Sequence, residues 1–159
     1  MTDPIAILLV EDSPADVELT LRAFHRRKLT NPITVARDGE EALDYVHRRG
    51  AFAERAPVPG LILLDLRIPK LDGLEVLRHI KQHEVYRNIP VVVLTTSAED
   101  RDVAASYDLG AASYIVKPVA FENFQEVVER INLYWILTNV PYPVRGEGAS
   151  GDRPRHPLR

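Results

Sequence analysis

Six polar residues directly follow apolar runs of the chain, and their types suit metal and phosphate chemistry. They are two adjacent acids, a third acid, two threonines and a lysine: Glu11, Asp12, Asp65, Thr95, Thr96 and Lys117. A carboxylate at the end of an apolar run is costly to bury, because desolvation disfavours its charged form. Taken singly, each residue has a structural explanation as a turn acid, a strand-end hydroxyl or a solvated lysine. Taken together, they indicate a functional site if the fold brings them to one place.

The chemistry of this set is specific. Three neighbouring carboxylates repel one another, and a hard divalent cation relieves that repulsion. Mg²⁺ prefers oxygen ligands and is often bound by a couple of carboxylates and a phosphate. With the acids neutralised, Asp65 could act as a nucleophile and form an aspartyl phosphate. The hydroxyl of Thr95 and the ammonium of Lys117 could then each stabilise one phosphoryl oxygen.

The elements that must position these residues are five apolar runs of strand length: residues 5–10, 33–36, 61–65, 91–96 and 113–116. The segments between them have helical periodicity and begin at capping residues such as Ser13, Asp38 and Asp72. Five repeats of strand and helix predict an α/β fold with one parallel sheet, helices on both faces, and a site at the carboxyl ends of the strands.

Composition limits the partners. The chain has 159 residues, is 45% hydrophobic and has a formal net charge of −3, which fits one globular domain and gives no case for nucleic-acid or membrane binding. The absence of cysteine excludes disulfides and thiolate metal sites. The five histidines are expected to be solvated. The apolar run at 5–10 lacks the basic flank of a signal peptide, so we expect a cytoplasmic protein.

The predicted domain covers residues 4–143, and residues 144–159 are predicted to be a disordered tail. Apolar residues are almost absent from the sequence RGEGASGDRPRHPLR, and the VPYP segment before it cannot continue a helix. We therefore expect no DNA-binding or catalytic output domain after the folded part. The output would then be a change in protein contacts or a phosphoryl relay.

Four segments carry a family resemblance: LLVED (8–12), LLDLRIPKLDG (63–73), VVVLTTSA (91–98) and YIVKPV (114–119). Through them, about residues 5–138 resemble the receiver domains of two-component response regulators. The resemblance implies a flavodoxin-like (βα)₅ doubly wound domain whose Asp65 is phosphorylated by a partner histidine kinase. It implies a phosphoacceptor signalling protein and not an enzyme acting on an external substrate.

The same resemblance assigns roles to the site residues. Asp12 and Asp65 would bind Mg²⁺, or alternatively Mn²⁺, through their side chains, Glu11 mainly through water, and Arg67 through its backbone carbonyl. Asp65, Thr95 and Lys117 would carry the phosphotransfer. Thr95 would also be the switch hydroxyl and Tyr114 the aromatic switch residue. The peptide bond before Pro118 would be cis.

A narrower resemblance points to the stand-alone regulators that partner bacterial phytochromes. It is carried by ILLVEDSPADVELT, TVARDGEEALDYV, the long connection 48–60 and the ending NLYWILTNVPYP. It implies a phytochrome as the sensor kinase and a homodimer formed through the fourth and fifth helices. Apolar residues near the end of the fifth helix would form the interface: Tyr134, Trp135 and Leu137. The alternative is that the VPYP arm folds back over them.

Arg67 stands two positions after the phosphoacceptor, and Ser97 two positions after Thr95. In receivers these side chains flank the path of the hydrolytic water, so both are expected to modulate the lifetime of the phosphate. Arg67 also argues against a phosphohydrolase of the haloacid dehalogenase class, which needs an acid at this position. The pair Glu11-Asp12 argues against an FMN-binding flavodoxin, because it would repel a phosphate in the absence of metal.

Overall fold

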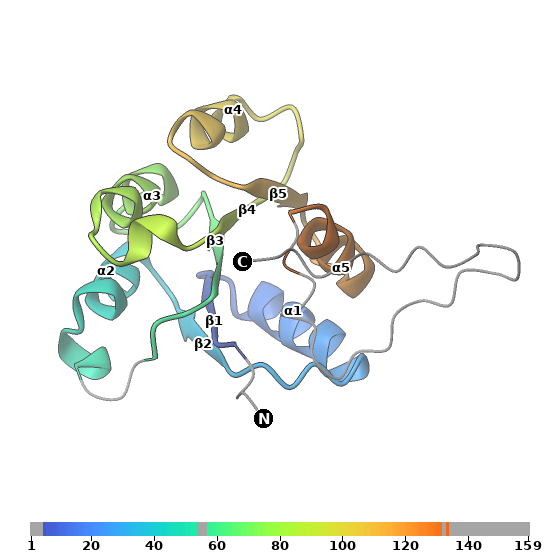
Figure 1. The fold of residues 1–159 in the computed structure, drawn as a ribbon. Coiled ribbons are helices and arrows are strands. Elements are labelled where there is room, and N and C mark those ends of the chain that lie inside the picture. Colours follow the sequence, from blue (N-terminus) through green and yellow to red (C-terminus); the bar gives the residue numbers. More distant parts are fainter. Residues whose placement is uncertain (1–4, 54–56, 132, 134–159) are drawn as a thin grey trace, which may run out of the picture.

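The computed structural model describes residues 5–53, 57–131 and 133, and this part of the chain forms one five-stranded parallel sheet (Figure 1). The strand order is β2-β1-β3-β4-β5. The strands are β1 (Ile7–Val10), β2 (Ile33–Ala36), β3 (Leu61–Asp65), β4 (Val91–Thr95) and β5 (Ser113–Val116). The first and fourth are slightly shorter than predicted. The predicted flavodoxin-like fold is confirmed.

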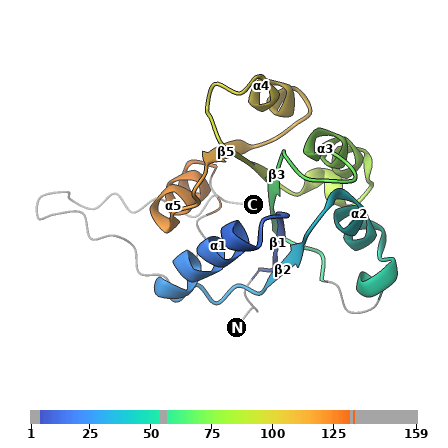
Figure 2. The ribbon, with the colours of Figure 1, turned by 180° about the vertical axis from the view of Figure 1, so that it is seen from behind.

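Five α-helices connect and cover the strands. They are α1 (Pro14–Arg26), α2 (Gly39–His47), α3 (Gly73–Gln82), α4 (Arg101–Asp108) and α5 (Phe121–Arg130), with 3₁₀ turns η1 (Gly50–Phe52) and η2 (Tyr86–Asn88). Helices α1 and α5 lie together on one side of the sheet, while α2 and α3 lie side by side on the other, with α4 next to α3 (Figures 1 and 2). The two layers of helices leave the strands in the interior.

The core explains why the strand sequences are continuously apolar. Alternate residues of one strand point to opposite faces of a sheet. Leu8 and Val10 accordingly pack in a cluster with residues of α2 and α3, whereas Ile7 and Leu9 pack in a second cluster with residues of α1 and α5. A strand covered on both faces needs apolar residues at every position, as in other doubly covered parallel sheets.

Side-chain caps start four of the five helices, α1 to α4. The Ser13 side chain accepts a hydrogen bond from the Asp16 N–H (3.2 Å), and the Asp38 carboxylate accepts one from the Glu41 N–H (2.8 Å). Asp72 caps α3 in the same way, and Asp100 caps α4. These caps satisfy backbone groups that a helix start leaves unpaired, which fixes the exit of each loop from the sheet.

Some of the predicted features concern residues that the structure does not describe. Tyr134, Trp135, Leu137 and the tail 144–159 are among these residues. Within the described residues, none of the helices is both long enough and apolar enough to span a bilayer.

His83 is half-buried, and its Nδ1 accepts the N–H groups of Val85 and Tyr86 at 3.1 Å, so it stabilises a turn. The expectation that it is a solvated surface histidine was wrong.

Candidate functional site

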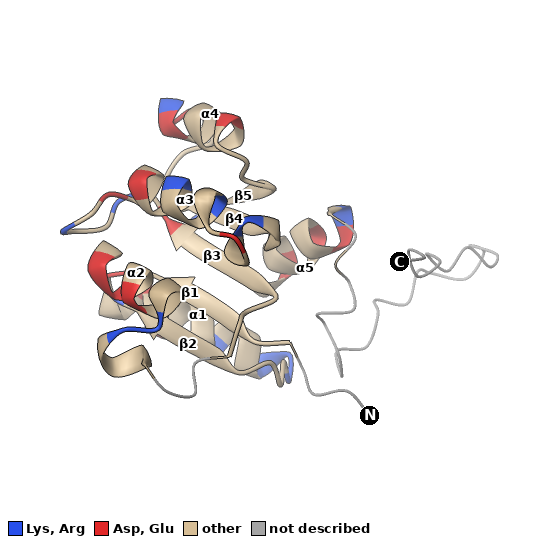
Figure 3. Ribbon diagram, turned by 60° about the vertical axis from the view of Figure 1, so that its left-hand side comes forward, with Lys and Arg blue, Asp and Glu red and all other residues tan. Residues whose placement is uncertain are grey.

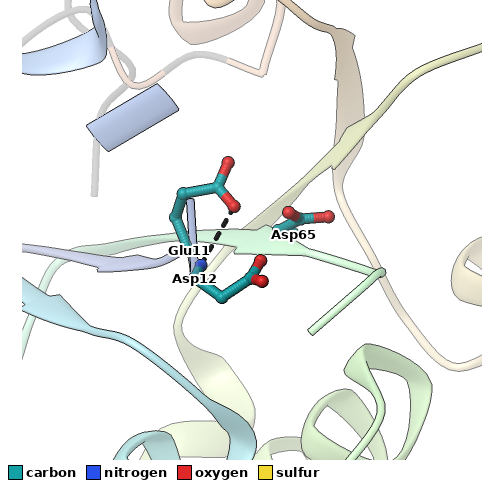
Figure 4. A group of neighbouring side chains, drawn as sticks. All are labelled: Glu11, Asp12 and Asp65. Carbon is teal, nitrogen blue, oxygen red and sulfur yellow. Dashed lines mark hydrogen bonds between the residues drawn. The ribbon is translucent and has the colours of Figure 1, made fainter. Parts of the chain in front are cut away.

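Three acids meet where β1 and β3 end. Glu11 and Asp12 follow β1, Asp65 is the last residue of β3, and one carboxylate oxygen of each lies within 4.8 Å of the others (Figure 4). Glu11 is 1% exposed and Asp65 2%, while Asp12 is exposed. Strand β1 lies between β2 and β3, and the chain passes from β1 to β2 on one side before it crosses to β3 on the other side. The cluster therefore lies at the point where the strand order reverses. Ligand sites of doubly wound sheets occur at such points.

Lys117 provides the positive charge at this cluster. Its Nζ lies 2.6 Å from Glu11 Oε1, 2.6 Å from Asp65 Oδ2 and 3.1 Å from Asp16 Oδ2. Burial opposes the charged ammonium, but hydrogen bonds to Asp65 and Glu11 raise the pKa of Lys117 above its usual value. The Lys117–Pro118 peptide bond, which sets the exit of the chain from β5, is cis. Asp16 was not predicted as a partner of Lys117, because its place in the first turn of α1 already explains an acid there.

The charge state of Glu11 differs from that of an exposed acid. Burial, together with a hydrogen bond to Asp65, raises the pKa of Glu11 to about 8. Glu11 therefore holds a proton near neutral pH when no cation is bound. Its Oε2 also accepts the backbone N–H of Asp12 at 3.0 Å, which orients the side chain (Figure 4). The proton on Glu11 and the ammonium of Lys117 together make two buried carboxyl groups tolerable in the metal-free protein.

The donor set fits a hard divalent cation. All three side chains at the cluster offer carboxylate oxygens, and they are close enough to share one ion. Asp12, the exposed member, leaves the site open to solvent, from which Mg²⁺ keeps several of its ligands as water. The backbone carbonyl of Arg67 remains a predicted ligand.

Thr95 and Tyr114 lie on the same face of the sheet. In the register of β4 and β5, Val93 pairs with Tyr114 and Thr95 with Val116, and residues two apart in a strand share a face. Thr95 is buried, and its hydroxyl donates to the carbonyl of Ser97 at 3.1 Å. Tyr114 is half-buried and meets the ring of Tyr107 edge-on, with centroids 6.3 Å apart. Thr96 is exposed and makes no part of this arrangement.

Arg67 connects the site to α4. Its backbone N–H donates to Asp65 Oδ1 at 2.9 Å, while its guanidinium forms ion pairs of 2.7 Å with Asp100 and with Asp102. The hydrogen bond with Asp100 raises the pKa of Arg67. The pKa of Asp100 is lowered by the hydrogen bond from the backbone N–H of Asp102 and by its contact with Arg67. Nothing in the sequence indicated these two partners. The influence of Arg67 and Ser97 on phosphate lifetime remains a prediction.

An acid cluster, a strand-end lysine and a strand-end hydroxyl at the edge of a five-stranded parallel sheet define the receiver class of signalling domains. Residues 7–129 match the model of the response regulator receiver domain, and the chain belongs to this family. Because the match spans the strand ends that carry Glu11, Asp65, Thr95 and Lys117, the family and the site concern the same part of the chain.

Two curated relatives match the chain over most of their length. The "Probable methanogenesis regulatory protein FilR2" of Methanothrix harundinacea is 48% identical over 139 residues, which are 86% of this chain and 87% of FilR2. Response regulator Rcp1 of Synechocystis is 42% identical over 135 residues, 85% of this chain and 91% of Rcp1.

The similar solved structures include phytochrome response regulators. The bacteriophytochrome response regulator AtBRR is 46% identical with a TM-score of 0.79, over 87% of this chain and 99% of AtBRR. The Mn²⁺-bound form of Rcp1 has a TM-score of 0.69 at 41% identity, over 88% of this chain and 99% of that one. The phosphorylated cyanobacterial phytochrome response regulator RcpA has a TM-score of 0.71 at 40% identity, over 84% of this chain and 95% of RcpA.

Proposed function

We propose that this protein is a single-domain response regulator that accepts a phosphoryl group on Asp65 from a partner histidine kinase, in a Mg²⁺-dependent reaction. The observation that carries the proposal is the position of Asp65. It is a buried carboxylate at a strand end, 2.6 Å from Lys117 and within the three-acid cluster that fits a divalent ion. A strand-end acid with only a structural role would not need a cation and two further acids around it.

The proposed reaction moves one phosphoryl group. A carboxylate oxygen of Asp65 forms a bond to phosphorus, and the bond from phosphorus to the imidazole nitrogen of the phosphohistidine breaks. The electron pair of that bond stays on the imidazole, which carries a proton on its other ring nitrogen and so leaves as neutral histidine. Lys117 is placed to bind a phosphoryl oxygen, since its Nζ already contacts Asp65 Oδ2. A bound divalent ion would neutralise the acids and share the phosphoryl charge.

The proposed switch begins at Thr95. Its hydroxyl would leave the Ser97 carbonyl and donate to a phosphoryl oxygen, which draws Thr95 toward Asp65. Tyr114, which lies on the same face of the sheet, would then turn inward toward the space behind Thr95. A local charge at the site would in this way change the surface formed by α4, β5 and α5.

Two relatives support the chemistry. A Mn²⁺-bound form of Rcp1 and a phosphorylated form of RcpA have both been solved, and both resemble this chain along more than four-fifths of its length. We propose Mg²⁺, with Mn²⁺ as a substitute, as the ion bound here. The likeness to the phytochrome response regulators AtBRR and RcpA supports a bacterial phytochrome as the cognate kinase. We propose the cytoplasm as the place of this reaction. Because FilR2 is named as a probable methanogenesis regulatory protein, a histidine kinase other than a phytochrome is the alternative to be tested.

The test of the phosphoacceptor uses acetyl phosphate as donor and intact-protein mass as readout, with and without Mg²⁺. We expect one Mg²⁺-dependent phosphoryl adduct on the wild-type protein and none on Asp65→Asn. Asp72→Asn is the matched control, because it removes a nearby carboxylate outside the acid cluster, and asparagine still caps α3. An adduct that persists in Asp65→Asn, or one that forms equally well without Mg²⁺, would refute the proposal.

We further propose a homodimer through α4, β5 and α5. Tyr107 on α4 and Val116 on the edge strand β5 are 44% and 37% exposed, so apolar side chains face outward from this surface. The predicted interface residues Tyr134, Trp135 and Leu137 lie outside the described residues. Light scattering on Val116→Lys should show a weakened dimer, whereas Val85→Lys, at an exposed site next to η2, should not. A wild-type protein that is monomeric at micromolar concentration would end this part of the proposal.

A further inference from the structure

Arg67 contacts two different parts of the protein, the start of α4 through its side chain and Asp65 through its backbone. Through its guanidinium it reaches α4, where Nη2 lies 2.7 Å from Asp100 Oδ2 and Nη1 lies 2.7 Å from Asp102 Oδ2. Through its backbone N–H it contacts Asp65 Oδ1 at 2.9 Å. One residue therefore touches the proposed phosphoacceptor and also holds the start of a helix that follows a different strand.

The two acids on α4 are more enclosed than the arginine that binds them. The side chains of Asp100 and Asp102 are 13% and 25% exposed, whereas that of Arg67 is 61% exposed. Ion pairs with such an exposed partner are weak and easily exchanged. Asp100 has a second task, because its Oδ1 accepts the backbone N–H of Asp102 at 2.9 Å and so caps α4. The cap uses one oxygen of Asp100 and the tether to Arg67 uses the other.

The loop between β3 and α3 carries basic residues (Figure 3), and one of them, Lys70, has ion pairs similar to those of Arg67, which provides an internal comparison. Lys70 pairs with Asp38, the capping residue of α2, at 3.4 Å and with Glu40 at 3.6 Å. Both cations thus bind the acids that start a neighbouring helix. Of the two, Arg67 is the one whose own backbone contacts Asp65.

We propose that Arg67 is a phosphorylation-dependent tether of α4. This inference rests on the proposed function, since it needs a phosphoryl group on Asp65. In the unphosphorylated protein the guanidinium holds the start of α4 against the β3–α3 loop. A phosphoryl group adds charge and three strong acceptors beside Arg67, and a guanidinium fork matches phosphate geometry. Arg67 then turns from Asp100 and Asp102 to the phosphoryl oxygens, and the start of α4 is released.

The helix itself should survive this release. Asp100 keeps its cap on α4, and Asp102 in the first turn is favoured by the helix dipole. With Arg67 turned to the phosphoryl oxygens, however, the two carboxylates lose their cationic partner. Like-charge repulsion then favours movement of the start of α4 away from the site. The tether is a second route from Asp65 to the output surface, separate from Thr95 and Tyr114.

The test compares backbone hydrogen exchange in the first turn of α4, with and without saturating beryllofluoride and Mg²⁺, in four proteins. In the wild type we expect activation to raise this exchange about three- to fivefold, the ratio that loss of an exposed ion pair corresponds to. Arg67→Gln and Asp100→Asn should show the raised exchange before activation and little further change. Asp100→Asn keeps the capping oxygen Oδ1 and replaces Oδ2, the partner of Arg67, with an amide nitrogen. Lys70→Gln should behave as the wild type.

Two further outcomes separate this inference from the proposed function. If beryllofluoride with Mg²⁺ does not protect the wild-type segment around Asp65, the proposed function fails. If that segment is protected but exchange in α4 rises as much in Arg67→Gln as in the wild type, or in neither, the tether is refuted.

Discussion

Lys117 Nζ lies 2.6 Å from Asp65 Oδ2, although 52 positions separate the two residues in the sequence. Strand β4 lies between β3 and β5, so the lysine side chain crosses the end of β4 to reach the acid. The same nitrogen is 2.6 Å from Glu11 Oε1. One ammonium group therefore balances two buried carboxyl groups that belong to different strands.

Removing this cation should destabilise the metal-free protein. The side chains of Glu11 and Asp65 are 2% and 4% exposed, and Lys117→Met would remove the ammonium that contacts both. We expect the free energy of unfolding in urea to fall by about 3–5 kcal/mol, with part of the loss recovered in Mg²⁺. Lys70→Met, which removes an exposed lysine, is the control and should have no comparable effect. Equal stability of Lys117→Met and the wild type would contradict the expectation.

Binding of Mg²⁺ should release a proton. Because burial raises the pKa of Glu11 to about 8, this carboxyl is protonated at neutral pH and must lose its proton as a cation binds. The affinity for Mg²⁺ should therefore rise with pH, by up to about tenfold per pH unit, and level off above about pH 8. Calorimetry in buffers of different ionisation enthalpy measures the released proton. A Glu11→Gln variant should release none, and equal proton release from both proteins would count against the assignment.

The stability of the metal-free protein should depend on the same group. In the unfolded chain Glu11 has its ordinary pKa of 4.5. Between about pH 4.5 and pH 8, Glu11 is therefore protonated in the folded protein and ionised in the unfolded chain. Since stability falls with pH wherever the folded state binds more protons, the contribution of Glu11 is lost as the pH rises through 8. Urea unfolding across this range should show the decline in the wild type and a flatter profile in Glu11→Gln.

Gly73 should be needed for the geometry of the site as well as for stability. A Cβ at this position would lie 2.5 Å from Leu66 Cα and 2.7 Å from the carbonyl oxygen of Asp65. Gly73→Ala must therefore displace the backbone that holds Asp65, and we expect a loss of about 1–3 kcal/mol together with weaker Mg²⁺ binding. Gly60→Ala is the control, because its Cβ would meet Ile5 at the amino end of β3. It should lower stability and leave the Mg²⁺ affinity unchanged.

The proposed switch predicts a change in one aromatic pair. Tyr114 and Tyr107 meet edge-on in the structure, with centroids 6.3 Å apart. Beryllofluoride with Mg²⁺ should remove the nuclear Overhauser contact between these rings in the wild type and in Thr95→Ser, which keeps the hydroxyl. Thr95→Ala should retain the contact at saturating beryllofluoride. If the contact is lost in Thr95→Ala as well, Thr95 is not the link to Tyr114.

The sequence by itself determined the strands, the helix starts and the place of each site residue along its strand. Continuous apolar runs such as LILLD can be stable only with both faces covered, and they end where the polar residue must reach the edge of the sheet. Ser13, Asp38 and Asp72 each cap a helix within a few residues of their own position. These features depend on neighbours in the chain, so local patterns were enough to predict them.

Tertiary structure decided the pairs that join distant segments. The strand order places Lys117 across β4 from Asp65, and the packing of α1 adds Asp16 as a third acid at the same ammonium. The approach of α4 to the β3–α3 loop gives Arg67 its two carboxylate partners. An exposed arginine can pair with any acid within the reach of its side chain. Its residue type therefore indicates a charge, and only the folded arrangement of loop and helix determines the partner.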